Sequence, residues 1–447
     1  MRVPFSRRLA LPAFSSLAAL VAPMLLGEAG QVLIQLTDTV MVGKLGSVAL
    51  AASALAGNFV MFALYFAYGA IGSVAPRIGQ SFGAGDTAGV KSIARSGAVL
   101  GLGVGVLVAL CLTLIIPFLG LLGQPAEVVE SAGGYFLLSA WSMPGAMLAV
   151  VLGQMAEAVN RPWPVLAVMA GAVLLNCGLN YLLIFGKFGF PELGLEGAGW
   201  ATLIARSLQA LALGVWLLTD GKLAVIRETQ ASGEVWGGLI QLGREGLPVA
   251  GQDVLEGGSF ALGSLMLGWL GTTAMAANQI AMSIASLAWM FPMALSTATG
   301  VRVAQASGAG DIAGARRVGV AAVWYGAGLM AVCAVMYVAL GPLLAGFFTT
   351  DPEVAQLAGL LVMIAGFYQI SDAVQSVSLG ALRGMLDNKV PLAANAVCYW
   401  VLSLPTVYVL TFMLGWGAVG VWVGYLPWMV LTGAFLLWRF RRLTSPR

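Results

Sequence analysis

The sequence predicts an all-α integral membrane protein with twelve transmembrane helices, in two six-helix lobes related by a parallel pseudo-twofold repeat. Three observations lead to this prediction. Of the 447 residues, 60% are hydrophobic and 9% are charged, whereas soluble domains carry about 25% charged residues. Long apolar runs follow one another with only short polar breaks between them. The second half of the chain also repeats the first.

The apolar runs are long enough to cross a bilayer as helices. Several are longer than the roughly 20 residues that a straight crossing needs, which indicates helices that tilt or extend beyond the bilayer. The first run follows Arg7 and Arg8 but has no small-residue cleavage site, so we expect a membrane span there and not a signal peptide. The expected spans are 14–40, 48–78, 90–119, 127–156, 163–186, 196–219, 235–270, 272–305, 315–341, 353–384, 390–414 and 417–440.

The basic residues predict the orientation of these spans. With the N-terminus in the cytoplasm, 19 of the 22 Lys and Arg residues fall on the inner side. Only Lys44 and Lys187 fall on the outer side, and Arg206 lies within a span. Cytoplasmic loops carry an excess of Lys and Arg. We therefore expect both termini in the cytoplasm, which requires an even number of spans.

The two halves of the sequence align with each other. Gly46 to Lys91 aligns without a gap with Gly271 to Arg316, at an offset of 225 in residue number, which places Gly83-Ala-Gly-Asp86 on Gly308-Ala-Gly-Asp311. Each half holds six spans, so both halves have the same orientation, as in carriers that work by alternating access. The predicted parts are an N-lobe of residues 1–219, a cytoplasmic linker of residues 220–234 and a C-lobe of residues 235–447.

The seventh and tenth spans carry carboxylates where membrane helices normally have none. Asp253 and Glu256 share one face of the seventh span, and Asp372 lies at a similar depth in the tenth. A carboxylate at the bilayer centre costs about 2.5–3.5 kcal/mol on insertion scales, so such residues are usually functional. Glu256 and Asp372 sharing a desolvated site would hold a Na⁺ ion or one proton. An internal hydrogen-bonded pair or a salt bridge is the structural alternative.

The acids of one half are not repeated in the other. At the offset of 225, Glu256 aligns with Gln31, and Asp38 aligns with Gly263. Carboxylates needed only for folding should recur in both halves. The difference therefore indicates that each carboxylate serves its own task.

The first span carries a polar stripe. Glu28, Gln31, Gln35 and Asp38 are spaced i, i+3, i+7 and i+10. This spacing forms one helical face about 15 Å long. Such a face cannot meet lipid without a large cost. We expect it to line a cavity; helix–helix hydrogen bonding without a ligand is the alternative.

A possible N-lobe cation site combines Asp38 with three neutral oxygen donors. Asn176 and Asn180 are one turn apart in the fifth span, and Thr202 lies in the sixth. Oxygen ligands of this kind suit a hard cation. Packing of the Asn side chains against backbone is an equally good interpretation. We also expect Arg206, near mid-depth in the sixth span, to pair with Glu28 or Glu157.

Aromatic and Met side chains suit flat lipophilic cations, because they adapt in shape and attract positive charge. The eighth span carries Asn278, Met282 and Trp289 on one face. Ordinary packing or lipid contact is the alternative for each residue. The expected substrate cavity comprises Gln31, Gln35, Asp253, Asn278, Met282 and Trp289.

Several motifs, taken in order, resemble the MATE (multidrug and toxic compound extrusion) transporters, in their NorM-like bacterial branch. The resemblance covers about residues 10–440, and Asn278 stands where many members have His. The motifs are Thr37-Asp-Thr-Val-Met-Val-Gly43, Gly246-Leu-Pro248 with Glu256, Ala276-Ala-Asn-Gln-Ile280, Tyr368-Gln-Ile-Ser-Asp-Ala-Val-Gln375 and Ala381-Leu-Arg-Gly384.

The resemblance implies a multidrug efflux antiporter in the bacterial inner membrane that confers antimicrobial resistance. Such a carrier exports organic, mostly cationic compounds in exchange for Na⁺ or H⁺, and the resemblance implies that Glu256 and Asp372 carry the coupling. We expect no cofactor, no nucleic-acid partner and a monomer. A flippase for a lipid or lipid-linked saccharide is the alternative, although its phosphate would favour a basic cavity over an acidic one.

An enzyme is not expected. The chain has no His, and Cys111, Cys177, Cys333 and Cys398 stand singly within apolar runs. No zinc pattern and no pairing of a nucleophile with a base follows from these residues. We therefore expect no catalytic residues and no metal other than a transported Na⁺.

Overall fold

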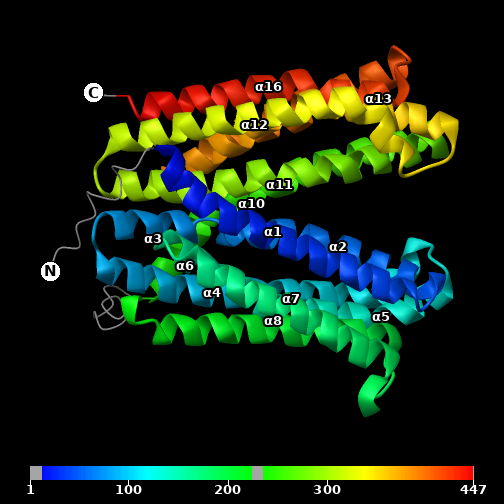
Figure 1. Ribbon diagram of the computed structural model, residues 1–447, viewed down its shortest axis with the longest axis horizontal. Coiled ribbons are helices and arrows are strands. Elements are labelled where there is room, and N and C mark those ends of the chain that lie inside the picture. The colour runs from blue at the N-terminus through cyan, green and yellow to red at the C-terminus, as the bar shows by residue number, and fades with distance from the viewer. Residues whose placement is uncertain (1–12, 224–234, 446–447) are drawn as a thin grey trace. The chain divides into compact units, whose positions relative to one another are not determined.

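The structure, a computed structural model, describes residues 13–223 and 235–445. These residues form helices joined by short connections, and none of them is in a strand (Figure 1). Most of the expected linker 220–234 lies outside the described residues, and so do the side chains of Gln31 and Gln35. The prediction of an all-α protein is confirmed.

The first half of the chain forms eight α-helices and three short 3₁₀-helices in the described range. Each connection between them is a few residues long. The elements are α1 (Ala13–Gly43), α2 (Ser47–Ile71), α3 (Val74–Gly83), α4 (Thr87–Ile115), η2 (Ile116–Leu122), α5 (Ala126–Trp141), α6 (Met143–Ala158), α7 (Pro162–Phe185), η3 (Lys187–Gly189), α8 (Gly194–Thr219) and η4 (Gly221–Leu223).

The second half begins with the four longest helices of the described chain. Two π-helical stretches follow, on either side of Pro405. The elements are α10 (Val235–Leu270), α11 (Thr272–Gly308), α12 (Ile312–Gly346), α13 (Pro352–Gly384), α14 (Lys389–Ala396), η5 (Val397–Ser403), α15 (Leu404–Tyr408), η6 (Val409–Met413) and α16 (Gly417–Leu443).

Eleven stretches of helix within the described ranges are long and apolar enough to cross a membrane. The predicted seventh span, α10, is not among them, although it has 36 residues. It carries Arg244, Glu245, Asp253 and Glu256, which lower its hydropathy. The carboxylates of the seventh span thus lie on a long helix that hydropathy alone does not mark as a span.

Two predicted spans are broken in the structure. The span 48–78 is interrupted between α2 and α3, where Gly72 and Ser73 form a turn. The span 127–156 is interrupted at Ser142, whose hydroxyl donates to the Ser139 carbonyl at 2.6 Å. Pro144 follows in the first turn of α6, where its missing N–H is tolerated. These breaks lie inside apolar runs, so hydropathy does not reveal them.

The helices group into two compact units by their contacts. One unit, the N-half unit, comprises Ala22–Ala250. The other, the C-half unit, comprises Met1–Val21 and Gly251–Arg447. Within the second unit, α13 packs against α11, α12 and α16 (Figure 1). The N-half unit has its own core around Phe136, Met143 and Met147, and the C-half unit has one around Tyr399 and Met429. The lobe boundaries and the pseudo-twofold relation remain predictions.

The repeated sequence motif forms the same turn twice. Gly85 and Gly310 have φ angles of 73° and 78°, in the left-handed region that favours glycine. The residue after each glycine caps the next helix. Asp86 accepts from the Gly89 N–H at 2.8 Å, and Asp311 accepts from the Gly314 N–H at 2.7 Å. The two halves therefore begin α4 and α12 in the same way.

Helices α11 and α13 approach each other through glycine. A Cβ atom on Gly380 would lie 2.2 Å from the Ser296 carbonyl oxygen, and one on Gly384 would lie 2.5 Å from the Gly300 carbonyl oxygen. Small residues let membrane helices pack backbone to backbone. The Ser296 hydroxyl also donates to the Ser376 carbonyl at 2.6 Å. This close contact fixes the part of α13 that follows Asp372.

Candidate functional site

The C-half unit brings Glu256 and Asp372 into one electrostatic neighbourhood. Glu256 lies on α10 and Asp372 on α13, and the charge of Asp372 acts on the Glu256 carboxylate. The Asp372 side chain is only 4% exposed, and its Oδ1 accepts from the Ser376 hydroxyl at 3.2 Å. Its Oδ2 has no hydrogen-bond partner among the described residues. A buried oxygen of this kind can take a proton or a cation.

Tyrosine hydroxyls complete this neighbourhood. The Tyr399 hydroxyl lies within hydrogen-bonding reach of the Glu256 carboxylate and accepts from Gln375 Nε2 at 2.7 Å. The Tyr368 hydroxyl is buried and finds no hydrogen-bond partner in the described part of the chain. Both carboxylates act electrostatically on Tyr368. The group therefore offers carboxylate, hydroxyl and amide oxygens, the ligand types that suit a hard cation.

Aromatic rings pack behind these polar groups. The Phe260 ring lies 6.2 Å from the Tyr368 ring, 5.7 Å from the Tyr399 ring and 5.2 Å from the Tyr425 ring, between centroids. Phe260 is one turn beyond Glu256 on α10, so it lies on the same side of that helix. The rings limit the access of water, which strengthens the electrostatic interactions of the carboxylates.

Asp253 is neutralised by a neighbour within its own unit. Arg383 Nη2 donates to Asp253 Oδ1 at 2.9 Å, and both side chains are about a quarter exposed. The equivalent residue in the first half is Glu28, since 253 − 28 equals the repeat offset of 225. At this position an acid does recur in both halves, so the expectation that the acids are not repeated was wrong for Asp253. Among the described residues, Glu28 forms no such ion pair; instead, its charge acts on Glu157. The repeat thus holds an acid with a base in one half and an acid with an acid in the other.

The N-half unit assembles the predicted cation-site residues. Asn180 Nδ2 donates to Asp38 Oδ1 and also to Asn176 Oδ1, the second at 3.2 Å. The Thr202 hydroxyl lies within hydrogen-bonding reach of the Asp38 carboxylate. Both Asn side chains are buried, and Asn180 Oδ1 lacks a hydrogen-bond partner within the described ranges. Helices α1, α7 and α8 therefore place one carboxylate, two amides and a hydroxyl together.

The expected ion pair of Arg206 was wrong. Among the described residues, the Arg206 guanidinium forms no ion pair with Glu28 or Glu157; its Nη1 donates to the Ser142 hydroxyl at 2.9 Å. Arg206 follows Thr202 by one turn of α8, so it lies near Asp38, on which its charge acts. Glu28 precedes Asp38 on α1 by about 15 Å along the helix axis. Arg206 therefore lies at the depth of Asp38, and Glu28 is too far along the membrane normal to be its partner.

The expected substrate residues on α11 differ in environment. Asn278 is buried, and its Oδ1 accepts from Trp422 Nε1 at 3.0 Å. Met282 and Trp289 are 41% and 43% exposed. Asn278 is therefore held inside the C-half unit, while the other two present free surface. The substrate cavity itself remains a prediction.

The sequence did not predict the tyrosines that adjoin these carboxylates. Tyr399 adjoins Glu256 and accepts from Gln375, and the charge of Asp38 acts on the Tyr135 hydroxyl. Tyr399 lies in the π-helical stretch η5, where the wider turn changes the direction of the side chain. The sequence feature that could have indicated these contacts is the presence of tyrosine hydroxyls within apolar runs.

Comparison with known proteins identifies the family. The MatE family model matches residues 23–182 and 248–409 of the chain. A probable multidrug resistance protein NorM of Rhodopseudomonas palustris is 38% identical over 431 residues, which covers 94% of this chain and 90% of that protein. A probable multidrug resistance protein NorM of Rhizobium meliloti is 34% identical and covers 94% and 91%.

A solved structure agrees with the fold. The eukaryotic MATE transporter AtDTX14 superposes with a TM-score of 0.87 at 23% identity, covering 97% of this chain and 96% of that one. The family model and the sequence relatives both extend over most of the chain and include the helices that carry Asp38, Glu256 and Asp372. The chain therefore belongs to the MATE family of membrane transporters, in its NorM-like bacterial branch.

Proposed function

We propose that this protein is a multidrug efflux antiporter that exports organic cations in exchange for Na⁺ or H⁺. The relatives that bear the name of multidrug resistance proteins support the substrate class. One observation carries the coupling: the charge of the buried Asp372 acts on Glu256 within a membrane helix bundle, and Asp372 Oδ2 has no hydrogen-bond partner among the described residues. Two such carboxylates cannot both stay charged without a counterion.

The proposed mechanism uses neutralisation of these carboxylates. When they are charged, they attract a cationic substrate, and Asp38 does the same in the N-half. Arrival of a proton or Na⁺ at Glu256 and Asp372 removes the negative charge, weakens the hold on the substrate and favours the other state of the carrier. Each charge that enters down roughly 100 mV supplies about 2.3 kcal/mol, which corresponds to about a fiftyfold concentration ratio.

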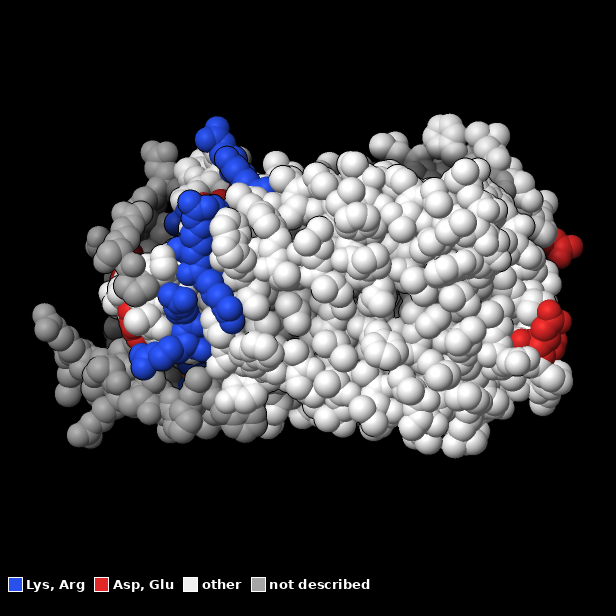
Figure 2. All heavy atoms as spheres, turned by 90° about the horizontal axis from the view of Figure 1, so that it is seen from above, with Lys and Arg blue, Asp and Glu red and all other residues white. Residues whose placement is uncertain are grey.

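The proposed setting is the bacterial inner membrane, with both termini in the cytoplasm and the protein acting as a monomer. The charge distribution supports this orientation. Figure 2 shows Lys and Arg gathered at one end of the visible face, with a few Asp and Glu among them, whereas the other end shows Asp and Glu without Lys or Arg. Basic residues are retained on the cytoplasmic side.

Everted membrane vesicles test the coupling. A Na⁺ gradient and a pH gradient are imposed separately, and uptake of a fluorescent organic cation is followed. At least one gradient should drive uptake. Transport that ignores both gradients would rule out ion-coupled antiport.

Site variants test the residues. Glu256→Gln and Asp372→Asn should each abolish gradient-driven uptake, because the amide cannot bind the coupling proton or supply charge to Na⁺. Glu353→Gln is the matched control, since Glu353 is an exposed carboxylate in the first turn of the same helix as Asp372. It should transport like the wild type. Near-normal uptake in both site variants would reduce Glu256 and Asp372 to structural residues.

A further inference from the structure

The start of α12 and the end of α16 are fixed side by side at one corner of the C-half unit. The Phe440 ring is fully buried and packs directly on the backbone of Gly319, where a Cβ atom would come within 2.4 Å of the ring. Gly319 lies near the start of α12, and Phe440 lies in the last turn of α16. Residues just before Gly319 and those on either side of Phe440 are therefore neighbours in space.

This corner carries more positive charge than its carboxylates can balance. Arg439 Nε donates to Asp387 at 2.8 Å, which neutralises one cation. Within the part of the chain that the structure describes, none of the other four arginines forms an ion pair with a carboxylate. Figure 2 shows basic side chains clustered at this end of the molecular face. The four are Arg316 and Arg317 on α12 and Arg441 and Arg442 on α16.

The exposed side of α16 changes from apolar to cationic along its length. Leu431, Phe435, Trp438 and Arg442 are all exposed and are spaced by four, three and four residues, which places them in one helical stripe. Trp438 is 51% exposed, and the Arg442 guanidinium lies 5.4 Å from the centre of its ring. An apolar, then aromatic, then cationic order matches the passage from acyl chains to headgroups at a membrane surface.

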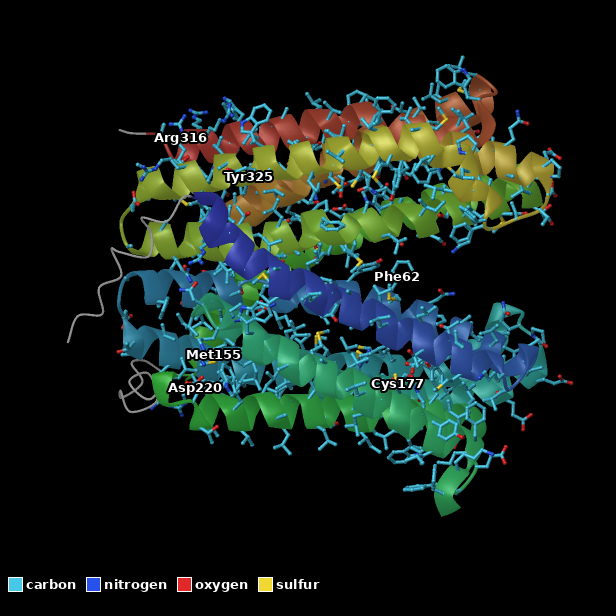
Figure 3. All side chains as sticks on the ribbon, viewed as in Figure 1. Phe62, Met155, Cys177, Asp220, Arg316 and Tyr325 are labelled. Atoms are coloured by element: carbon cyan, nitrogen blue, oxygen red, sulfur yellow. The ribbon has the colours of Figure 1, made fainter. Side chains whose placement is uncertain are left out.

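Helix α12 repeats this order in the opposite chain direction. Arg317 is exposed, and Trp324, two turns later on the same face, is 64% exposed. Val335, three further turns along, is 69% exposed. Arg316 and Tyr325 mark the cationic end and the aromatic level of this helix (Figure 3). Two adjacent stripes thus place arginines at one level and tryptophans at a deeper one.

In the first half, the helices that stand at the positions of α12 and α16 in the repeat carry cations on one of the two only. Lys91 and Arg95 lie on α4, but the last turn of α8 contains no Lys or Arg. Asp220, which follows α8, is paired with Arg161, whose guanidinium also lies 5.8 Å from the centre of the Trp216 ring. Arginines on both helices are therefore particular to the α12–α16 corner and do not follow from the repeat.

We infer that the α12–α16 corner binds the phosphate headgroup of an anionic phospholipid. Arginine guanidinium groups bind phosphate oxygens through paired N–H donors. The acyl chains would lie along the exposed stripes of α12 and α16, next to Trp324 and Trp438. A zwitterionic lipid would bind less tightly, because its own cation competes with the arginines for the phosphate. Clusters of basic residues at helix ends select anionic lipids.

Native mass spectrometry of the purified full chain tests this inference. The detergent-solubilised protein is titrated with phosphatidylglycerol or with phosphatidylcholine of the same acyl chains. The wild type should bind phosphatidylglycerol more tightly by about tenfold or more. The variant Arg317→Gln/Arg442→Gln should lose this preference, since two cations that contribute about fivefold each together contribute about 25-fold.

A matched variant and a soluble competitor complete the experiment. Lys91→Gln/Arg95→Gln removes two cations from α4, the repeat equivalent of α12, and should keep the preference for phosphatidylglycerol. Glycerol phosphate in excess should not displace the lipid. Equal binding of the two lipids by the wild type would overturn the inference without any variant. Equal loss in both variants, or displacement by glycerol phosphate, would overturn it as well.

Discussion

Asp253 on α10 and Arg383 on α13 form an ion pair between these two membrane helices. Its side chains are about a quarter exposed, and the N–O distance is 2.9 Å. Arg383 also reaches Gln252 Oε1 at 3.4 Å. The pair therefore connects the helix that carries Glu256 to the helix that carries Asp372. Removal of this ion pair should therefore lower the stability of the protein more than it weakens ion binding.

The variant Arg383→Gln should lower the stability of the purified protein by about 2 kcal/mol, because it leaves the Asp253 carboxylate without its cation. Thermal unfolding followed by tryptophan fluorescence measures the change. The second change Asp253→Asn, made in the Arg383→Gln background, should recover most of the loss, since no unpaired charge remains. An Arg383→Gln protein as stable as the wild type would show that the pair contributes nothing.

Asn180 determines how strongly the N-half site can attract a cation. It lies against Asp38 and Asn176, and Asp38 is the one carboxylate among the residues predicted for this site. The variant Asn180→Asp adds a second carboxylate and should tighten Na⁺ binding by about tenfold or more, because affinity rises with the charge of the ligands. Isothermal titration with Na⁺ measures this effect. Asn176→Ala, which removes an amide without adding charge, should not tighten binding.

At the scale of elements, the contact of α11 with α13 depends on the absence of side chains. The variant Gly380→Ala should destabilise the protein by about 1–3 kcal/mol, since the new methyl group meets the Ser296 backbone. Gly171→Ala is the control, because a Cβ atom there meets nothing within 4 Å. Thermal unfolding of both purified variants measures the difference. Equal midpoints of thermal unfolding for the two variants would contradict the close packing of α11 against α13.

The boundaries of most helices could be predicted from polar breaks, but their internal irregularities could not. The expected seventh span, 235–270, has the same bounds as α10. The break at Ser142 and the π-helical stretches around Pro405 lie within apolar runs. They depend on individual hydrogen bonds, such as that from the Ser142 hydroxyl to the Ser139 carbonyl, and on the N–H that Pro405 lacks.

At the scale of the whole molecule, the orientation is open to a direct test. Alkaline phosphatase fused after Arg447 should be inactive, and a green fluorescent protein fused there should fluoresce, since we expect this end in the cytoplasm. Alkaline phosphatase inserted at Gly189, in the connection between α7 and α8, should be active. The reverse pattern would contradict the predicted orientation.

The membrane environment made the fold predictable, because only helices satisfy every backbone group in lipid without closing a barrel. Composition therefore determined the fold class, and the positions of Asp38, Asn180 and Thr202 along their helices led to a cluster that the structure contains. The rotation of each helix about its own axis was not predictable. That rotation turns Asn278 toward Trp422 and Arg206 toward Ser142.

The two ion pairs at the helix ends have opposite polarity. In the first half, Arg161 in a loop meets Asp220 after α8; in the second, Asp387 in a loop meets Arg439 on α16 (Figure 3 labels Asp220). A chain with two similar halves could dock its final helices on the wrong partners during insertion. An exchange would set Arg161 against Arg439 and Asp220 against Asp387, and like charges repel. The reversed signs would therefore disfavour docking of α8 or α16 on the other half and favour docking on its own.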